Sequence, residues 1–103
     1  MSESVPIITH DTYTIIEAND AACELFGYER IDLIDQQLTA GIYGSDMQWL
    51  AGLRLKTIRE QGELPEQDLP FYRASGSVFW ARVKTTKLSS GLFKTTLIYL
   101  YEY

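Results

Sequence analysis

The C-terminal part of the chain constrains its fold most strongly, because three strand-like segments follow one another there with only short turns between them. Alternating apolar, β-branched and aromatic residues predict strands over residues 67–73, 78–88 and 93–103. The glycine-containing segments 74–77 and 89–91 are typical of hairpin turns. Strands joined by such short turns pair antiparallel, so this part of the chain predicts a three-stranded antiparallel meander.

The N-terminal part predicts a β-hairpin that leads directly into a short helix. Residues 7–10 and 13–18 are rich in Ile, Thr and Tyr and are typical of its two strands. Asn19 is a typical helix N-cap, because its side-chain oxygen can accept a hydrogen bond from a free backbone amide of the first turn. Gly27 can adopt a positive φ and end this helix, and residues 29–34 predict a further helical turn.

The longest predicted helix begins at Ser45 and ends before Gly62. Ser45 and Gln48 have the spacing of a capping box, in which each side chain bonds the free backbone amide of the other residue. An apolar stripe on this helix, with Trp49 beside it, comprises Met47, Leu50, Leu53 and Ile58. Together with the strands, these helices predict an α+β domain in which the helices pack on one face of a five-stranded antiparallel sheet.

The length of the chain fits one domain, residues 1–103, with residues 1–6 as an N-terminal tail. No apolar run approaches the ~20 residues that span a bilayer, and the N-terminus lacks the basic and apolar segments of a signal peptide. Cys23 is the only cysteine, which excludes an internal disulfide. We therefore expect a protein of the reducing cytoplasm, without membrane insertion.

The charge of the chain is acidic and unevenly distributed. The net charge is −5 at pH 7, with nine acidic residues and one basic residue in positions 1–50 and five acidic and eight basic residues in positions 51–103. A general nucleic-acid binder needs a concentrated basic surface, which a modest basic excess in one half does not predict. The ordinary interpretation is a solvated protein surface, so we expect no nucleic-acid partner.

Several spaced motifs resemble those of one family. Asn-Asp-Ala-Ala at 19–22, followed by Leu-Phe-Gly-Tyr at 25–28, is similar to its N-x-A-A…L-F-G-Y signature, and 75–81 resembles the hairpin that opens its fourth strand. By the order and spacing of these motifs, residues 7–103 resemble the PAS domain family of bacterial-type sensory and dimerisation modules. Asp35 stands where the family often has Gly, which leaves the conformation of that turn open.

The resemblance implies a small pocket between the inner face of the sheet and the helices. Strand alternation then predicts these pocket residues: Ile8, His10, Trp49, Leu53, Leu69, Phe71, Phe79, Ala81, Val83, Thr96 and Ile98. Because this set is nearly all apolar, it favours a small apolar ligand. The alternative is an ordinary filled core, with Phe71, Phe79 and Trp49 occupying the space. A register error of one residue would reverse any of the strand assignments.

The opposite face of the predicted sheet carries an aromatic patch. The candidates for it are Trp80, Leu97, Tyr99 and Tyr101. Exposed patches of this kind mark interfaces, and Tyr and Trp combine apolar area with a polar tip. We therefore expect a homodimer formed through this face. The alternative is that a flanking segment of a longer chain covers it.

Cofactor hypotheses also follow from the resemblance. Photosensory members hold a flavin beside a reactive cysteine, but the matching position here is Leu38, and Cys23 lies on the first helix instead. Phe71 and Ala81 stand where amides contact the flavin. Haem-binding members use a histidine on the long helix, whereas His10 is the only histidine here; it is either a ligand contact or an ordinary packed residue. No Cys/His cluster predicts a metal site. The cofactor is therefore unknown, with flavin–cysteine photochemistry and haem disfavoured.

Three functional classes remain open from the sequence. The first is a sensor in which a small molecule biases an attached output domain, and the second is a ligand-free dimerisation module. The third, a small isomerase-like enzyme, is disfavoured because no catalytic motif is present. The resemblance implies an output domain such as a histidine kinase or a cyclic-dinucleotide enzyme. Because the family continues past this point into a helical linker, we expect the chain to be an excised piece of a longer signalling protein.

Overall fold

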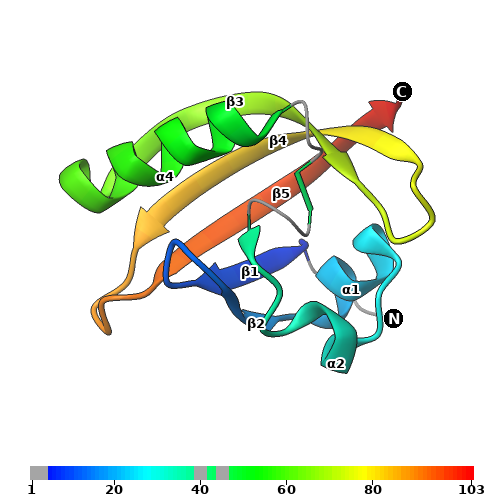
Figure 1. Cartoon of the computed structure of the whole chain (residues 1–103), viewed down its shortest axis with the longest axis horizontal. Helices are drawn as coiled ribbons and strands as arrows, with labels where there is room; N and C mark the ends of the chain where they lie inside the picture. The colour runs from blue at the N-terminus through cyan, green and yellow to red at the C-terminus, as the bar shows by residue number, and fades with distance from the viewer. Residues whose placement is uncertain (1–4, 39–41, 44–46) are drawn as a thin grey trace.

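The computed structural model describes residues 5–38, 42–43 and 47–103. Its sheet has five strands in the order β2-β1-β5-β4-β3, and each neighbouring pair is antiparallel (Figure 1). The strands are β1 (Ile7–His10), β2 (Ile15–Ala18), β3 (Glu63–Tyr72), β4 (Val78–Lys87) and β5 (Phe93–Glu102). The predicted meander is confirmed, since the last three strands are neighbours in sequence and in space. β3 begins earlier than predicted, with a bulge between Leu64 and Gln67 that accommodates Pro65.

Within the described residues, three helices with defined bounds pack on one face of this sheet, which confirms the predicted fold class. They are α1 (Asp20–Phe26), α2 (Arg30–Leu33) and α4 (Gln48–Gln61). Figure 1 shows α1 and α2 together near the β1–β2 hairpin, while α4 runs along β3. The buried core between the layers comprises Ile8, Ile15, Ala18, Ala22, Phe26, Leu33, Leu38, Ile42, Leu69, Phe71, Phe79, Ala81, Val83 and Leu97.

The boundaries of α1 follow from two residues, as predicted. The Oδ1 atom of Asn19 accepts hydrogen bonds from the backbone amides of Ala22, at 2.9 Å, and Ile7, at 3.0 Å. Asn19 therefore caps the helix and ties its start to β1. At the other end Gly27 has φ +76°, and its amide donates to the Cys23 carbonyl at 2.9 Å. This left-handed conformation, which favours glycine, ends the helix.

The predicted inner face of α4 is wrong at two pocket candidates. Trp49 is 70% exposed and Leu53 is 55% exposed. The buried residues are Ala51, Arg54 and Ile58, which recur at the spacing of one helix face. Arg54 lies in this buried layer with its guanidinium bonded to Gln67 of β3, a position that a hydrophobicity pattern does not assign to a charged residue. The predicted Ser45–Gln48 capping box involves Ser45, which lies outside the described residues.

The predicted faces of β5 are also wrong for most of the strand. Leu97, predicted for the outer face, lies opposite Val83 and is fully buried. Ile98, predicted for the pocket, is 50% exposed. Thr96, also predicted for the pocket, lies opposite the exposed Lys84. The inner face of this part of β5 therefore carries the odd-numbered residues.

A β-bulge explains this reversal. Trp80 lies opposite Tyr101, but Ala81 lies opposite Tyr99, so β5 contains one extra residue at this point. An extra residue reverses the alternation of side chains on one side of the bulge. Tyr101 is consequently on the Trp80 face, as predicted. Tyr99 is instead on the inner face, where its ring lies 6.2 Å from that of Phe79, so its predicted place in the outer patch is wrong.

The turn after α2 has a defined conformation although Asp35 stands where the family often has Gly. Asp35 adopts φ +74°, in the left-handed region that favours glycine, and its amide donates to the Ile15 carbonyl at 2.7 Å. Asp is among the residues that enter this region at a moderate cost. The chain therefore makes the turn that glycine would make, and it joins the end of α2 to β2.

Candidate functional site

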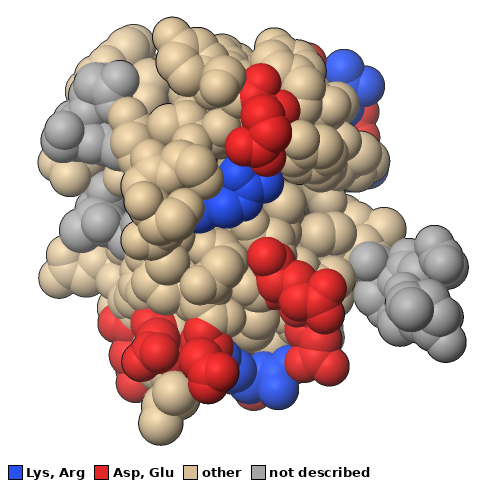
Figure 2. All heavy atoms as spheres, turned by 90° about the vertical axis from the view of Figure 1, so that its right-hand side faces the viewer, with Lys and Arg blue, Asp and Glu red and all other residues tan. Residues whose placement is uncertain are grey.

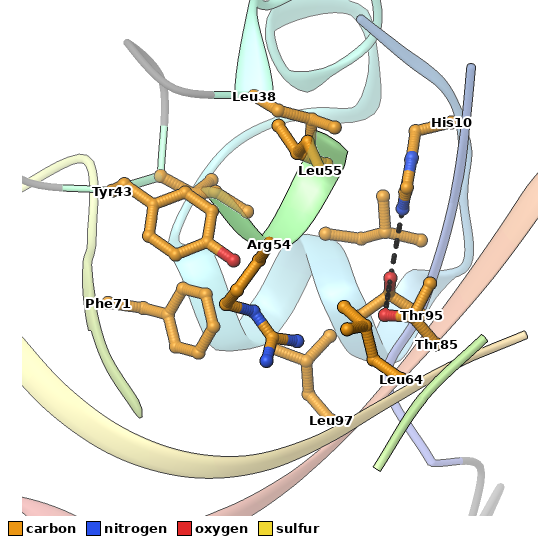
Figure 3. A pocket seen from close by; sticks show the side chains of 12 residues that line it. His10, Leu38, Tyr43, Arg54, Leu55, Leu64, Phe71, Thr85, Thr95 and Leu97 are labelled. Carbon is orange, nitrogen blue, oxygen red and sulfur yellow. Dashed lines mark hydrogen bonds between the residues drawn. The ribbon is translucent and has the colours of Figure 1, made fainter. Parts of the chain in front are cut away.

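A cavity of about 30 Å³ lies between β1, β5 and α4 (Figure 3). It is lined by Ile8, His10, Leu38, Ile42, Tyr43, Arg54, Leu55, Leu64, Phe71, Thr85, Thr95 and Leu97. Most of these side chains are apolar, and the polar ones form two groups. The volume gives room for about two water molecules. Only a very small molecule fits this space unless the wall moves.

The first polar group is a chain of hydrogen bonds that begins at His10. The Nδ1 atom of His10 accepts from the backbone amide of Thr12 at 3.1 Å, so the ring proton of the neutral imidazole is on Nε2. Nε2 donates to the Thr95 hydroxyl at 2.9 Å, and the hydroxyls of Thr95 and Thr85 are 2.7 Å apart. Burial lowers the pKa of His10 from 6.5 to about 4, against a smaller opposing effect of Asp11. His10 is therefore neutral at pH 7.

The second polar group is Arg54 with its neighbours. Arg54 is only 6% exposed, and Figure 3 shows its guanidinium inside the cavity. Its Nη1 atom donates to the Oε1 atom of Gln67, a neutral acceptor on β3. Figure 3 also shows the Tyr43 hydroxyl turned toward Arg54. Burial raises the pKa of Tyr43, although Arg54 opposes this effect, so the hydroxyl keeps its proton at pH 7. Arginine stays protonated in proteins, which gives the cavity a permanent positive charge.

The predicted pocket residues fall into three groups in the structure. Those that line the cavity are Ile8, His10 and Phe71. Those buried in the core away from it are Leu69, Phe79, Ala81 and Val83, and those outside the inner layer are Trp49, Leu53, Thr96 and Ile98. The sequence-based set missed the other lining residues: Leu38, Ile42, Tyr43, Arg54, Leu55, Leu64, Thr85, Thr95 and Leu97. For Arg54 a signal was present, because it stands three residues after Ala51 and four before Ile58.

The outer face of the sheet carries a smaller aromatic patch than predicted. The rings of Trp80 and Tyr101 stack with centroids 6.2 Å apart, and Tyr101 is 55% exposed. Ile98 shares this face and lies opposite Arg82. The Nε and Nη2 atoms of Arg82 donate to the two carboxylate oxygens of Asp68 at 2.8 and 3.2 Å. The patch that the structure supports is therefore Trp80, Ile98 and Tyr101, beside one ion pair.

The end of β5 is held by Arg73. Its guanidinium pairs with the Glu102 carboxylate at 2.5 and 2.8 Å, donates to the Leu25 carbonyl at the end of α1 at 2.9 Å, and lies 4.6 Å from the centre of the Phe79 ring. On this side of the molecule, where the C-terminus lies, Figure 2 shows basic side chains adjoining acidic ones rather than forming a continuous basic surface. Arg73 thus links α1, the sheet and the end of the chain.

The residues present do not fit a flavin that reacts with a cysteine, or a haem. Cys23 is on α1 and does not line the cavity, while Leu38 does. A cavity of about 30 Å³ is far smaller than the several hundred Å³ of a site for a large organic ligand. Both ring nitrogens of His10 already have hydrogen-bond partners. No group of three or more His, Cys, Asp or Glu side chains suited to a metal ion occurs within residues 5–38, 42–43 and 47–103.

Comparison with known proteins identifies the family. A family model described as PAS domain matches residues 3–98, so the chain belongs to the PAS domain family. None of the curated proteins matches it. Within the part of the chain that the structure describes, no helix is long and apolar enough to cross a membrane.

Solved structures of PAS and LOV domains share this fold. One is the ethanol complex of the PAS domain of a LuxR-family transcriptional regulator from Burkholderia thailandensis, with TM-score 0.78, 22% identity and coverage of 95% of this chain and 90% of that one. A second is a domain of a sensory box histidine kinase/response regulator from Geobacter sulfurreducens, with TM-score 0.78, 19% identity, and 91% and 82% coverage. A third is the LOV domain of a blue-light activated histidine kinase from Erythrobacter litoralis, with TM-score 0.80, 22% identity, and 97% and 99% coverage.

Proposed function

We propose that this chain is a sensory module that binds a small molecule in the cavity and transmits its presence to an attached output domain by contacts, without catalysing a reaction. PAS domains are generally sensory, non-catalytic modules, and the similar structures include domains of regulators and kinases. The observation that carries the proposal is a small cavity with convergent polar groups, His10 and Arg54, in a mostly apolar wall. The Burkholderia PAS domain was solved in complex with ethanol, which is a molecule small enough to compare with this cavity.

β5 offers a direct route from the cavity to the rest of a signalling protein. Thr95 and Leu97 line the cavity, and the same strand ends at Glu102, which pairs with Arg73. A ligand that favours one position of β5 changes the population of conformations at the end of this strand. The output domain in this proposal is a histidine kinase or a cyclic-dinucleotide enzyme. The apolar ligand expected from the sequence stays a prediction. Arg54 in the cavity wall would also give such a ligand a charged contact.

A thermal-shift panel of small alcohols, amides and carboxylates tests the proposal. At roughly ten times its Kd, a ligand specific for the folded state stabilises it by about 1.4 kcal/mol, which raises the melting temperature by about 6 °C. In Leu55→Trp a larger side chain replaces one that lines the cavity. We expect a compound that stabilises the unmodified chain and leaves the melting temperature of this variant unchanged. Equal shifts in both proteins, or none with any compound, would count against a ligand cavity.

The outer patch supports a second role, dimerisation. Trp80 and Tyr101 stack there beside Ile98, and stacked aromatic residues with exposed apolar neighbours suit an interface. We expect sedimentation to show a dimer at high micromolar concentration and Trp80→Ala to weaken it about tenfold or more. Tyr13→Ala is the control, because Tyr13 is 62% exposed and does not belong to the patch. A monomer throughout, or equal effects of the two variants, contradicts this role.

A further inference from the structure

Arg54 is a buried cation without an anionic partner among the described residues. The ion pairs in this part of the chain join Arg30 with Asp20, Arg73 with Glu102, and Arg82 with Asp68. Arg54, at 6% exposure, has two neutral side chains as partners among the described residues: it donates to the Gln67 carboxamide, and a hydrogen bond with Tyr43 lowers the pKa of that hydroxyl against the effect of burial. A guanidinium has five N–H donors, more than these two contacts from the described residues use.

A buried guanidinium of this kind favours an anion. Transfer of a charge out of water costs several kcal/mol unless an opposite charge and hydrogen bonds replace the water. Arginine cannot relieve this cost by losing its proton. A carboxylate is well suited to it, because its two oxygens match the planar fork of the guanidinium.

The rest of the wall restricts the kind of anion. Tyr43 is a protonated donor next to Arg54, so it can donate to a carboxylate oxygen. His10 is neutral at pH 7 and donates to Thr95, so it supplies no second positive charge for a dicarboxylate or a phosphate. The remaining surface is largely aliphatic, and the space is small.

Building on the proposed sensory function, we infer that the cavity binds a short aliphatic monocarboxylate. Its carboxylate binds the Arg54 guanidinium and the Tyr43 hydroxyl, and its alkyl end lies against apolar side chains such as Ile8 and Leu97. Arg54 is then the residue that makes the sensor select an anion over a neutral molecule of the same shape.

Calorimetric titration with matched compounds tests this inference. The probes are acetate, propionate and butyrate, their neutral counterparts propionamide and 1-propanol, and inorganic phosphate. We expect the unmodified chain to bind at least one of the carboxylates and to prefer it about tenfold or more over the neutral probes, since a hydrogen bond to a charged group contributes about that factor. Phosphate should bind more weakly than the best carboxylate.

Variants of the two binding residues separate charge from shape. Arg54→Met keeps a long apolar side chain without the charge, and it should lower carboxylate affinity about tenfold or more while leaving 1-propanol binding within a factor of about two. Tyr43→Phe should lower carboxylate affinity about two- to tenfold. Circular dichroism checks that both variants fold, and the comparison of probes on the unmodified chain does not depend on either of them.

Asp46→Asn addresses the possibility that the chain supplies its own carboxylate. Asp46 is the nearest acidic residue before Arg54 in the sequence and lies outside the described residues. If carboxylates bind only after this substitution, or if neutral probes bind as tightly as carboxylates to the unmodified chain, the inference is overturned. Tight binding of 1-propanol alone would overturn the carboxylate assignment and leave the sensory proposal intact. Binding of no probe, with or without Asp46→Asn, would count against both.

Discussion

Replacing Phe26 with alanine is expected to lower the free energy of unfolding by about 3–5 kcal/mol. Phe26 is fully buried, and its ring lies 5.5 Å from that of Phe79 and 6.0 Å from that of Phe71, at steep angles. It therefore joins α1 to two strands of the sheet, and its loss leaves a cavity that the surrounding rings cannot close. Urea denaturation measures the difference.

Ile31→Ala is the matched control for Phe26→Ala, because Ile31 lies on the neighbouring helix α2 and is 84% exposed. Ile31→Ala should change the free energy of unfolding by no more than about 0.5 kcal/mol, as substitutions at exposed positions usually do. If the two variants differ by less than about 1 kcal/mol, α1 does not depend on this aromatic cluster and the described core is wrong.

Acidification from pH 7 to pH 5 is expected to destabilise the chain by about 2 kcal/mol through His10 alone. The pKa of His10 is lowered by burial to about 4, against 6.5 when unfolded. The unfolded chain therefore binds the proton first, so stability is greatest above pH 6.5 and falls as the pH decreases toward 4. Below pH 4 the total loss of free energy of unfolding due to His10 is about 3 kcal/mol. Chemical denaturation at a series of pH values measures it.

His10→Gln removes the titrating group and provides the control for this pH dependence. Its free energy of unfolding should change little between pH 7 and pH 5. Asp11, Asp68 and Glu102 have lowered pKa values because of their hydrogen bonds. Protonation of these carboxylates therefore lowers the stability of the chain only below pH 5. If the variant loses as much stability as the unmodified chain over the same range, His10 is not the group that titrates.

Local signals in the sequence were sufficient for most of the fold. The N-cap Asn19 and the helix-ending Gly27 act through their own backbone neighbourhood, so their residue types predict them. The meander follows from alternating strands and short turns. The inner residues of β4, Phe79, Ala81 and Val83, are confirmed as buried because that strand keeps its alternation along this stretch.

The candidate site was harder to predict, because non-local contacts decide it. The bulge between Tyr99 and Tyr101 exists only in the pairing of β5 with β4, and it moved Leu97 inward and Ile98 outward. Arg54 is buried because the cavity and Gln67 accept its charged end. Its spacing from Ala51 and Ile58 on α4 was a local signal, but the charge of an arginine side chain favours an exposed position when α4 is considered alone. Residues 38 and 42–43 reach the cavity from a segment that lies far from β5 in the sequence.

A ¹⁵N–¹H NMR titration of the chain with propionate and, separately, with 1-propanol tests directly whether the cavity binds a small molecule. We expect that at least one of them shifts, in a saturable way, the amide signals of His10, Thr85, Thr95 and Leu97, and that these shifts are absent in Leu55→Trp. Saturable shifts confined to surface residues, or no saturable shifts with either compound, would contradict the claim that this PAS domain holds a small molecule beneath its sheet.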